Sequence, residues 1–77
     1  MSGLIKNVAE MLPGEVGIIS GFTDELLSVK LMEMGCLPGA SVRFNFTAAF
    51  GDPICISVSG YELSLRREEA STISIIN

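Results

Sequence analysis

The sequence contains no histidine and only two cysteines, Cys36 and Cys55. Histidine is the side chain most often used as a general base near neutral pH and as a ligand for transition metals. The two cysteines lack the Cys-x-x-Cys spacing of structural zinc sites. Because the amino-terminal residues do not resemble a secretory signal, we expect two reduced thiols that pack as small hydrophobic side chains.

Clustered basic charge and long hydrophobic runs are also missing. The chain carries five lysines and arginines against nine acidic residues, and only Arg66 and Arg67 are adjacent. Nucleic-acid binding requires a clustered basic surface, and a net charge of −4 disfavours an anionic membrane surface as a direct partner. No apolar run approaches the ~20 residues that cross a bilayer. We therefore expect neither nucleic-acid binding nor direct membrane insertion.

Catalytic motifs are absent as well. The serines have no histidine partner for nucleophilic catalysis, and no glycine-rich phosphate-binding motif occurs. The acidic pairs at 24–25 and 68–69 are neighbours whose side chains point in different directions. Asp52 precedes Pro53 and a strand that we expect to end beside Arg66, which favours a structural ion pair or turn cap. We therefore predict a protein that is not an enzyme and holds no cofactor.

The chain is rich in apolar residues for its length. Its 77 residues suffice for one domain, at 1–77, and 48% of them are hydrophobic. Alternating apolar residues predict five short strands, at 16–22, 41–47, 53–58, 61–66 and 72–77. We expect an all-β fold in which these strands curl into a small closed or nearly closed barrel.

One hairpin allows its register to be checked from the sequence. If Ser59-Gly60 is a two-residue loop, the pairs facing each other across it are Val58 with Tyr61, Ile56 with Leu63, and Ile54 with Leu65. All six side chains then lie on one side of the sheet, and a slip of one residue would scatter them. In the first strand, the alternation predicts a shared face for Val16, Ile18 and Phe22.

One helix is predicted between the first and second strands. Thr23 or Asp24 can cap its amino terminus, and Gly35 suits the left-handed position that ends a helix. A pair typical of a type II turn, Pro38-Gly39, then leads into the next strand. We therefore interpret residues 31–44, LMEMGCLPGASVRF, as a structural corner and not as a metal site.

Two apolar sets lie on different sides of this helix. The set expected to face the core consists of Leu27, Leu31 and Met34. The other set consists of Leu26, Val29 and Met32. Because a helix beside a small barrel buries one face, the second set predicts an exposed apolar stripe that binds a partner protein. In the alternative arrangement, this set is covered by an amino-terminal segment that contains Leu4, Ile5 and Val8.

Four segments occur in a characteristic order along the chain. They are LPGEVGIISGF at 12–22, L-x-E-x-G-x-x-P-G at 31–39, G-D-P-I at 51–54 and S-L-R-R-x-E-A at 64–70. Together they resemble the FeoA family, the small ferrous iron transport protein A, over nearly the whole chain. The resemblance implies an SH3-like five-stranded barrel with one helix inserted after the first strand. The residues that we expect to be structural are Gly35, Pro38, Gly39, Asp52, Pro53 and Arg66.

The resemblance also implies a function. It implies a non-enzymatic cytoplasmic protein of ferrous iron uptake that binds and modulates the cytosolic part of a FeoB-type GTP-dependent transporter. Such a contact would hold the chain at the inner face of the cytoplasmic membrane. The candidate docking residues are Leu26, Val29 and Met32, and self-association through the same helix is left open. Two alternatives remain, namely binding or sensing of Fe²⁺, and modulation of a GTPase by Arg66 or Arg67.

The sequence departs from the family pattern at two places. Cys36 stands where the family usually has an aliphatic residue, which favours a packing role over a ligand role. The helix carries only Lys30 as a basic residue, whereas many relatives carry arginines ahead of the leucine. We therefore expect either a more apolar contact with the partner or a different partner.

Overall fold

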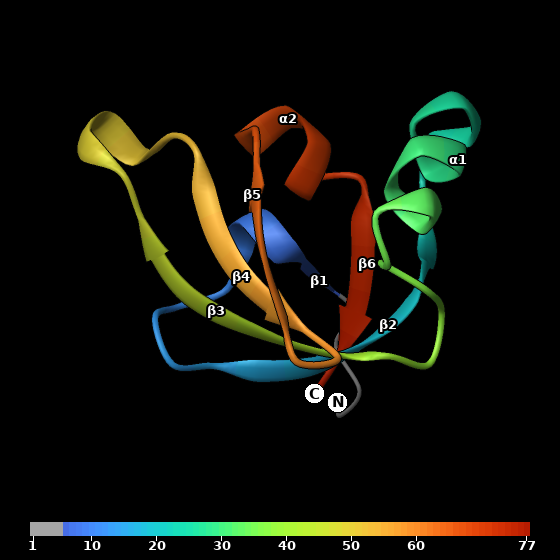
Figure 1. Ribbon diagram of the computed structural model, residues 1–77, viewed down its shortest axis with the longest axis horizontal. Coiled ribbons are helices and arrows are strands. Elements are labelled where there is room, and N and C mark those ends of the chain that lie inside the picture. Colours follow the sequence, from blue (N-terminus) through green and yellow to red (C-terminus); the bar gives the residue numbers. More distant parts are fainter. Residues whose placement is uncertain (1–5) are drawn as a thin grey trace.

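The computed structural model describes residues 6–77, which form one antiparallel sheet curled around a hydrophobic core (Figure 1). The strands are β1 (Lys6–Asn7), β2 (Val16–Phe22), β3 (Ser41–Thr47), β4 (Ile54–Val58), β5 (Tyr61–Leu65) and β6 (Ile73–Ile76). The helices are α1 (Glu25–Glu33), the one-turn α2 (Arg67–Ala70), and the 3-10 turns η1 (Val8–Glu10) and η2 (Ala49–Gly51). None of the helices in this part of the chain is long and apolar enough to cross a membrane.

The mostly-β fold with a helix after the first long strand agrees with the prediction, and the structure adds three details. The sheet has six strands in the order β1-β6-β2-β3-β4-β5, because β1 pairs with β6. Within residues 6–77 the sheet does not close, since β1 and β5 form its two ends. The segment after β5, Arg67–Ala70, is the helical turn α2.

The hairpin of β4 and β5 has the predicted register. Val58 pairs with Tyr61, Ile56 with Leu63, and Ile54 with Leu65. Ser59 and Gly60 both have positive φ, at 50° and 87°, as a type I′ turn requires. Burial decreases along β5 toward this turn: Leu65 is fully buried, Leu63 is half-buried and Tyr61 is 73% exposed.

The predicted face of β2 is wrong. Val16 and Ile18 are exposed, whereas Gly17 and Ile19 are buried. Gly17 faces the core at a position that has no room for a side chain, since a Cβ there would lie 2.8 Å from Cδ1 of Ile75. A register shift between Ile19 and Gly21 in the pairing with β6 then reverses the alternation, so that Phe22 packs against the core again.

The corner after α1 has the geometry that its residues favour. Asp24 caps the helix, since its Oδ1 accepts a hydrogen bond from the N–H of Leu27 at 2.9 Å. At the other end, the N–H of Cys36 donates to the carbonyl of Leu31 and Gly35 takes a φ of 110°, which together form a Schellman motif. Gly39 has a φ of 90° after Pro38 and donates its N–H to the carbonyl of Ile19 on β2 at 2.7 Å. The corner is therefore hydrogen-bonded to the sheet.

The inner set of α1 packs as predicted. Leu31 is fully buried, and Leu27 and Met34 are half-buried against the core. Cys36, just beyond the helix, is also fully buried, and this burial raises the pKa of its thiol. The helix is thus attached to the sheet through one side only.

Candidate partner-docking surface

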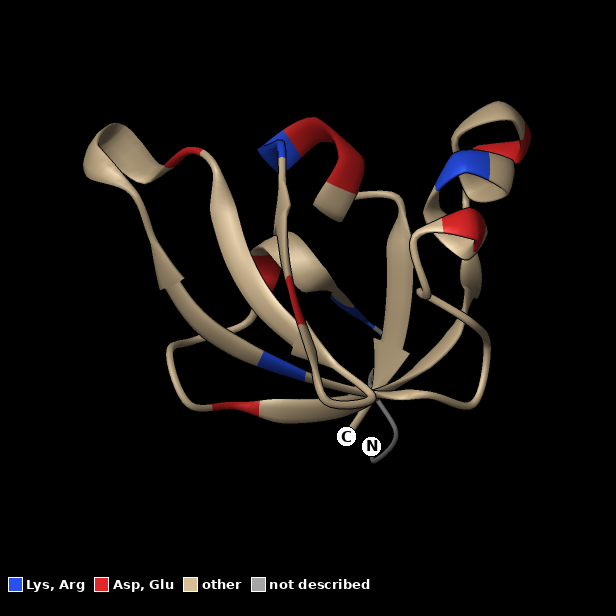
Figure 2. Ribbon diagram, in the orientation of Figure 1, with Lys and Arg blue, Asp and Glu red and all other residues tan. Residues whose placement is uncertain are grey.

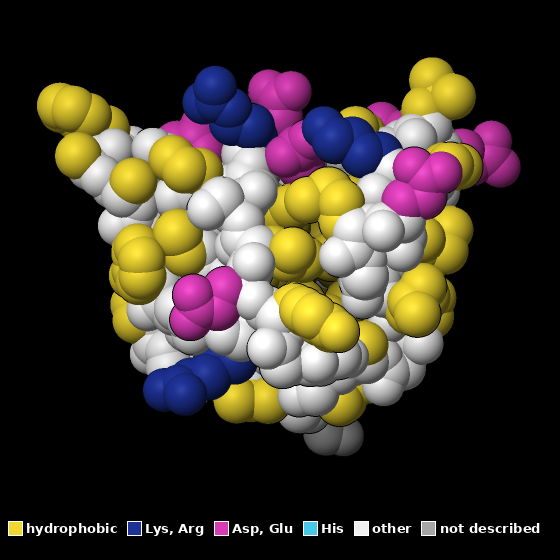
Figure 3. All heavy atoms as spheres, viewed as in Figure 1, with side chains coloured by type: hydrophobic (Ala, Val, Ile, Leu, Met, Phe, Trp, Pro, Cys, Tyr) yellow, Lys and Arg dark blue, Asp and Glu magenta, His cyan; other side chains and the backbone are white. Residues whose placement is uncertain are grey.

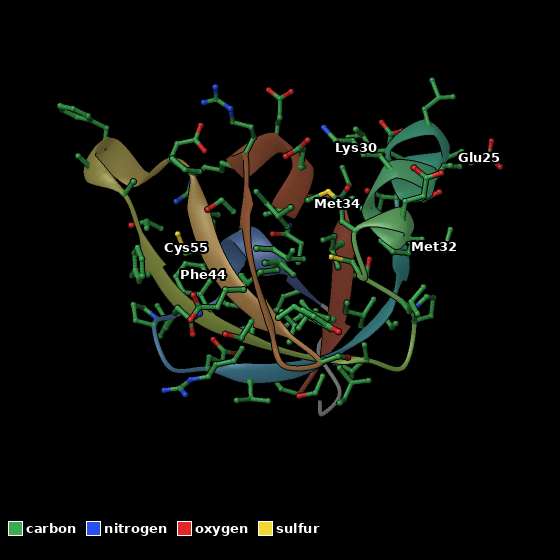
Figure 4. The ribbon with its side chains drawn as sticks, in the orientation of Figure 1. Glu25, Lys30, Met32, Met34, Phe44 and Cys55 are labelled. Atoms are coloured by element: carbon green, nitrogen blue, oxygen red, sulfur yellow. The ribbon has the colours of Figure 1, made fainter. Side chains whose placement is uncertain are left out.

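The outer side of α1 presents a row of apolar side chains, which we call the docking stripe, defined as Leu26, Val29 and Met32. Their exposed fractions are 88%, 57% and 36%. A spacing of three residues places neighbouring members on adjacent turns of the helix. In Figure 4, Met34 lies between α1 and β6, whereas Met32 lies on the far side of the helix. The stripe is therefore free of contact with the core.

The charges around the stripe are mostly acidic. Glu25 at the start of α1 and Glu33 at its end are exposed, and Lys30 is the only basic residue of the helix. Figure 2 shows this lysine between the two acidic ends. A partner that covers the stripe would therefore meet negative charge at both ends of it.

Lys30 is engaged within the chain. Its Nζ lies 2.7 Å from Oε2 of Glu69 on α2, and Oε1 of Glu69 accepts the N–H of Arg66 at 2.8 Å. The lysine, followed by the Arg66 N–H, lowers the pKa of the Glu69 carboxyl below its ordinary value of 4.5. This contact joins the two helices across 39 residues of sequence. The sequence does not predict this contact, since no local pattern signals a contact at this separation.

The contact predicts a pH-dependent contribution to stability. We expect Glu69→Gln to lower the free energy of unfolding by about 1 kcal/mol at pH 7, because the amide keeps the main-chain hydrogen bond but loses the ion pair. Since the folded-state pKa of Glu69 lies below 4.5, the unfolded chain binds this proton more readily, and the contribution is lost as the pH falls through the folded-state pKa. Urea unfolding of both proteins between pH 7 and about pH 3 measures the difference. The two curves should converge at the acidic end, and a constant gap would contradict the assignment.

The segment that could have covered the stripe is only partly described. Leu4 and Ile5 lie outside the described residues. Val8 is fully buried in η1, whose main contacts are with β6 and α2. Val8 therefore does not cover the stripe.

A second group of predicted residues lies where β4 begins and β5 ends. Oδ1 of Asp52 accepts the N–H of Arg67 at 2.9 Å, and Oδ2 lies 3.8 Å from Nη1 of Arg66. The peptide bond between Asp52 and Pro53 is cis. The guanidinium of Arg67 donates to the carbonyls of Gly51, at 2.9 and 3.1 Å, and of Ala9, at 3.3 Å. Arg67 thus connects three segments of the chain.

A shallow hollow of about 220 Å³ lies on β3, β4 and β5, and its lining residues are Asn45, Phe46, Cys55, Glu62, Leu63 and Ser64. Sγ of Cys55 is 3.6 Å from Oγ of Ser64. Cys36 is fully buried beside α1 and does not reach this hollow, so the structure does not bring the two cysteines together. Among residues 6–77, no group of three or more histidine, cysteine, aspartate or glutamate side chains could hold a metal ion.

The family model described as the FeoA domain matches residues 6–77, which is the whole described part of the chain. The chain belongs to the FeoA family. Membership in this family places it among proteins of ferrous iron transport. Among curated proteins, none matches the sequence.

Solved FeoA structures have the same fold. The chain is 29% identical to the iron uptake regulatory protein FeoA, with a TM-score of 0.82 over 95% of this chain and 96% of that one. It is also 29% identical to the FeoA-like protein of Clostridium acetobutylicum, with a TM-score of 0.86 over 97% and 87%. The FeoA of Stenotrophomonas maltophilia, solved with zinc and described as a prokaryotic SH3 domain protein, is 20% identical, with a TM-score of 0.78 over 90% and 87%. The SH3-like fold expected from the resemblance is confirmed.

Proposed function

We propose that this FeoA protein is a non-enzymatic, cytoplasmic accessory protein of ferrous iron uptake that binds and modulates the cytosolic part of a FeoB-type transporter. The observation that carries the proposal is the docking stripe: Leu26, Val29 and Met32 are exposed on a helix whose opposite side is anchored in the core. Clustered exposed apolar side chains on a small protein are typical of a protein contact. Family membership supports the role in ferrous iron uptake, and the stripe supports binding of the transporter through α1.

The way α1 is held supports a rigid docking element. Leu31 anchors it in the core, Glu69 holds Lys30, and the corner that follows the helix is hydrogen-bonded to β2. A helix fixed in this way loses little conformational freedom when it binds, which lowers the entropic cost of association. Because Glu25 and Glu33 flank the stripe, the complementary surface on the transporter should be an apolar groove with basic residues at its ends.

The alternative functions have less support. A GTPase-modulating role would need an arginine free to approach a phosphate. Of the two candidate arginines, Arg67 has its guanidinium bound to the carbonyls of Gly51 and Ala9, whereas Arg66 has a side chain that is 70% exposed and remains accessible. For Fe²⁺ binding, no specific observation in the described residues favours a site over the docking role.

The proposal is tested by titrating the purified chain against the cytosolic part of the transporter from the same organism. We expect saturable one-to-one binding in the micromolar range, as is typical of a small transient interface. Deleting the gene for the chain should lower ferrous iron uptake, and the intact gene should restore it. Absence of binding at roughly 100 µM, about −5.5 kcal/mol, would contradict the proposed partner.

A further inference from the structure

We propose that β5 is a self-association edge, at which two copies of the chain pair antiparallel about a twofold axis that passes beside Leu63. β5 lies at one end of the sheet and is hydrogen-bonded to β4 alone among the described strands. A strand at the end of a sheet can accept a further strand through its unpaired main-chain groups. The surface is distinct from the docking stripe on α1.

The pairing of β5 with β4 determines which main-chain groups are unused. In an antiparallel ladder, residues alternate between pairs that exchange hydrogen bonds and pairs that do not. The two-residue loop makes Val58 with Tyr61 a hydrogen-bonded pair, and the pairs containing Leu63 and Leu65 follow the same pattern. The N–H and C=O groups of Glu62 and Ser64 therefore point away from β4, and no described main-chain group bonds to them.

β5 has no lysine, proline or bulge to guard this edge, and its one charged side chain, Glu62, belongs to the contact that we propose. Natural sheets commonly protect an exposed edge with lysine, proline or a bulge. The strand reads Tyr-Glu-Leu-Ser-Leu, has no register shift against β4, and exposes Tyr61, Glu62 and Ser64. Figure 3 shows a hollow between β5 and β6 with hydrophobic side chains on its floor.

The edge is complementary to itself in one register. When Leu63 lies opposite Leu63 of the second copy, Glu62 lies opposite Ser64 of that copy, and Ser64 opposite its Glu62. The two residues of each pair can exchange two main-chain hydrogen bonds, so the two pairs form four such bonds in all. The side chains of Glu62, Ser64 and Arg66 share one face of the strand. Glu62 therefore lies diagonally across from Arg66 of the second copy, within reach of a long side chain.

Charge favours a second copy as the occupant of this edge. The side chain of Arg66 is 70% exposed, and its acidic neighbour Asp52 is 3.8 Å away, so the guanidinium is available to a carboxylate. Because of the twofold symmetry, the contact between Glu62 of one copy and Arg66 of the other occurs twice. Neighbouring registers are worse. In one of them, Glu62 lies opposite Glu62 of the second copy. In the other, Glu62 would have to exchange main-chain hydrogen bonds with Arg66 of the second copy, but the N–H and C=O of Arg66 already bond to Glu69 and Ala70.

The interface is small, because it consists of one strand pair and two ion pairs. We therefore expect a weak dimer that forms only at high micromolar concentration. Sedimentation equilibrium between about 10 µM and 1 mM, the range of weak transient complexes, should show the mass rising toward twice the monomer mass. A chain that stays monomeric throughout this range overturns the proposal.

A charge swap identifies the surface. Glu62→Arg and Arg66→Glu should each weaken dimerisation at least about tenfold, since each variant sets like charges across the twofold axis. An equimolar mixture of the two variants should form a heterodimer, because one copy then carries two arginines and the other two glutamates. Circular dichroism verifies that both variants are folded.

Matched variants separate this edge from other surfaces. Glu33→Arg changes the charge by the same amount on α1, and it should dimerise like the unmodified chain. If the mixture of Glu62→Arg and Arg66→Glu stays monomeric while the unmodified chain dimerises, β5 is not the interface. If Val29→Glu with Met32→Glu abolishes self-association, the docking stripe is the interface and the proposal is overturned.

Discussion

Replacing Val29 and Met32 together by glutamate is expected to weaken binding of the transporter's cytosolic part about a hundredfold. Each substitution would bury an unpaired carboxylate in the interface, and a cost of about 1.5 kcal/mol at each site gives this factor. The thermal midpoint should stay within about 3 °C, because both side chains are on the solvent side of α1 and changes at such positions alter stability by about 0.5 kcal/mol. Isothermal titration calorimetry and thermal unfolding measure the two quantities.

The control for this prediction makes the same chemical change elsewhere. Leu12 and Val16 are 68% and 49% exposed, comparable to the stripe, and lie at the end of β2 opposite to α1. The double variant Leu12→Glu with Val16→Glu adds the same negative charge but should leave the affinity within about threefold. An equal loss in this variant would show that net charge, and not the stripe, governs binding.

Shortening Leu31 to alanine should have the opposite consequence, a large loss of stability. Leu31 is the one residue of α1 whose side chain is fully buried. Substitutions of this kind cost about 2–5 kcal/mol through lost burial and the cavity left behind. For a domain of this size, about 3 kcal/mol corresponds to a midpoint roughly 15 °C lower. Urea unfolding gives the free energy directly.

The same substitution at an exposed position of α1 provides the comparison. Leu26 is 88% exposed on the same helix, so Leu26→Ala should change the free energy of unfolding by no more than about 0.5 kcal/mol. If Leu26→Ala were as destabilising as Leu31→Ala, the assignment of inner and outer sides of α1 would be wrong. The two variants therefore separate the inner side of α1, which stabilises the domain, from the outer side, which we propose as the partner contact.

The features that the sequence predicted correctly are local ones. The caps of α1 depend on Asp24 and Gly35, which act within a few residues of themselves. The register of β4 and β5 depends on a two-residue loop and on apolar residues beside it. Such short-range preferences are visible without any knowledge of the rest of the chain.

The features that the sequence did not predict depend on distant contacts. The buried face of β2 is set by Ile75, which leaves no room for a side chain at Gly17, and by the bulge near Ile19. In the same way, Lys30 contacts Glu69, and Arg67 contacts Gly51 and Ala9, only once the sheet has curled. The exposure of the docking stripe was one of two open alternatives, because the sequence does not show which surfaces a terminal segment covers.

The central claim, that the exposed side of α1 contacts the transporter, is tested most directly by nuclear magnetic resonance. The ¹⁵N-labelled chain is titrated with the unlabelled cytosolic part of the transporter, and the amide signals that shift are mapped. We predict that the largest shifts occur at Leu26, Val29 and Met32, while Phe46 and Cys55 in the hollow on the sheet stay in place. Shifts concentrated at Phe46 and Cys55, with α1 unchanged, would contradict the account.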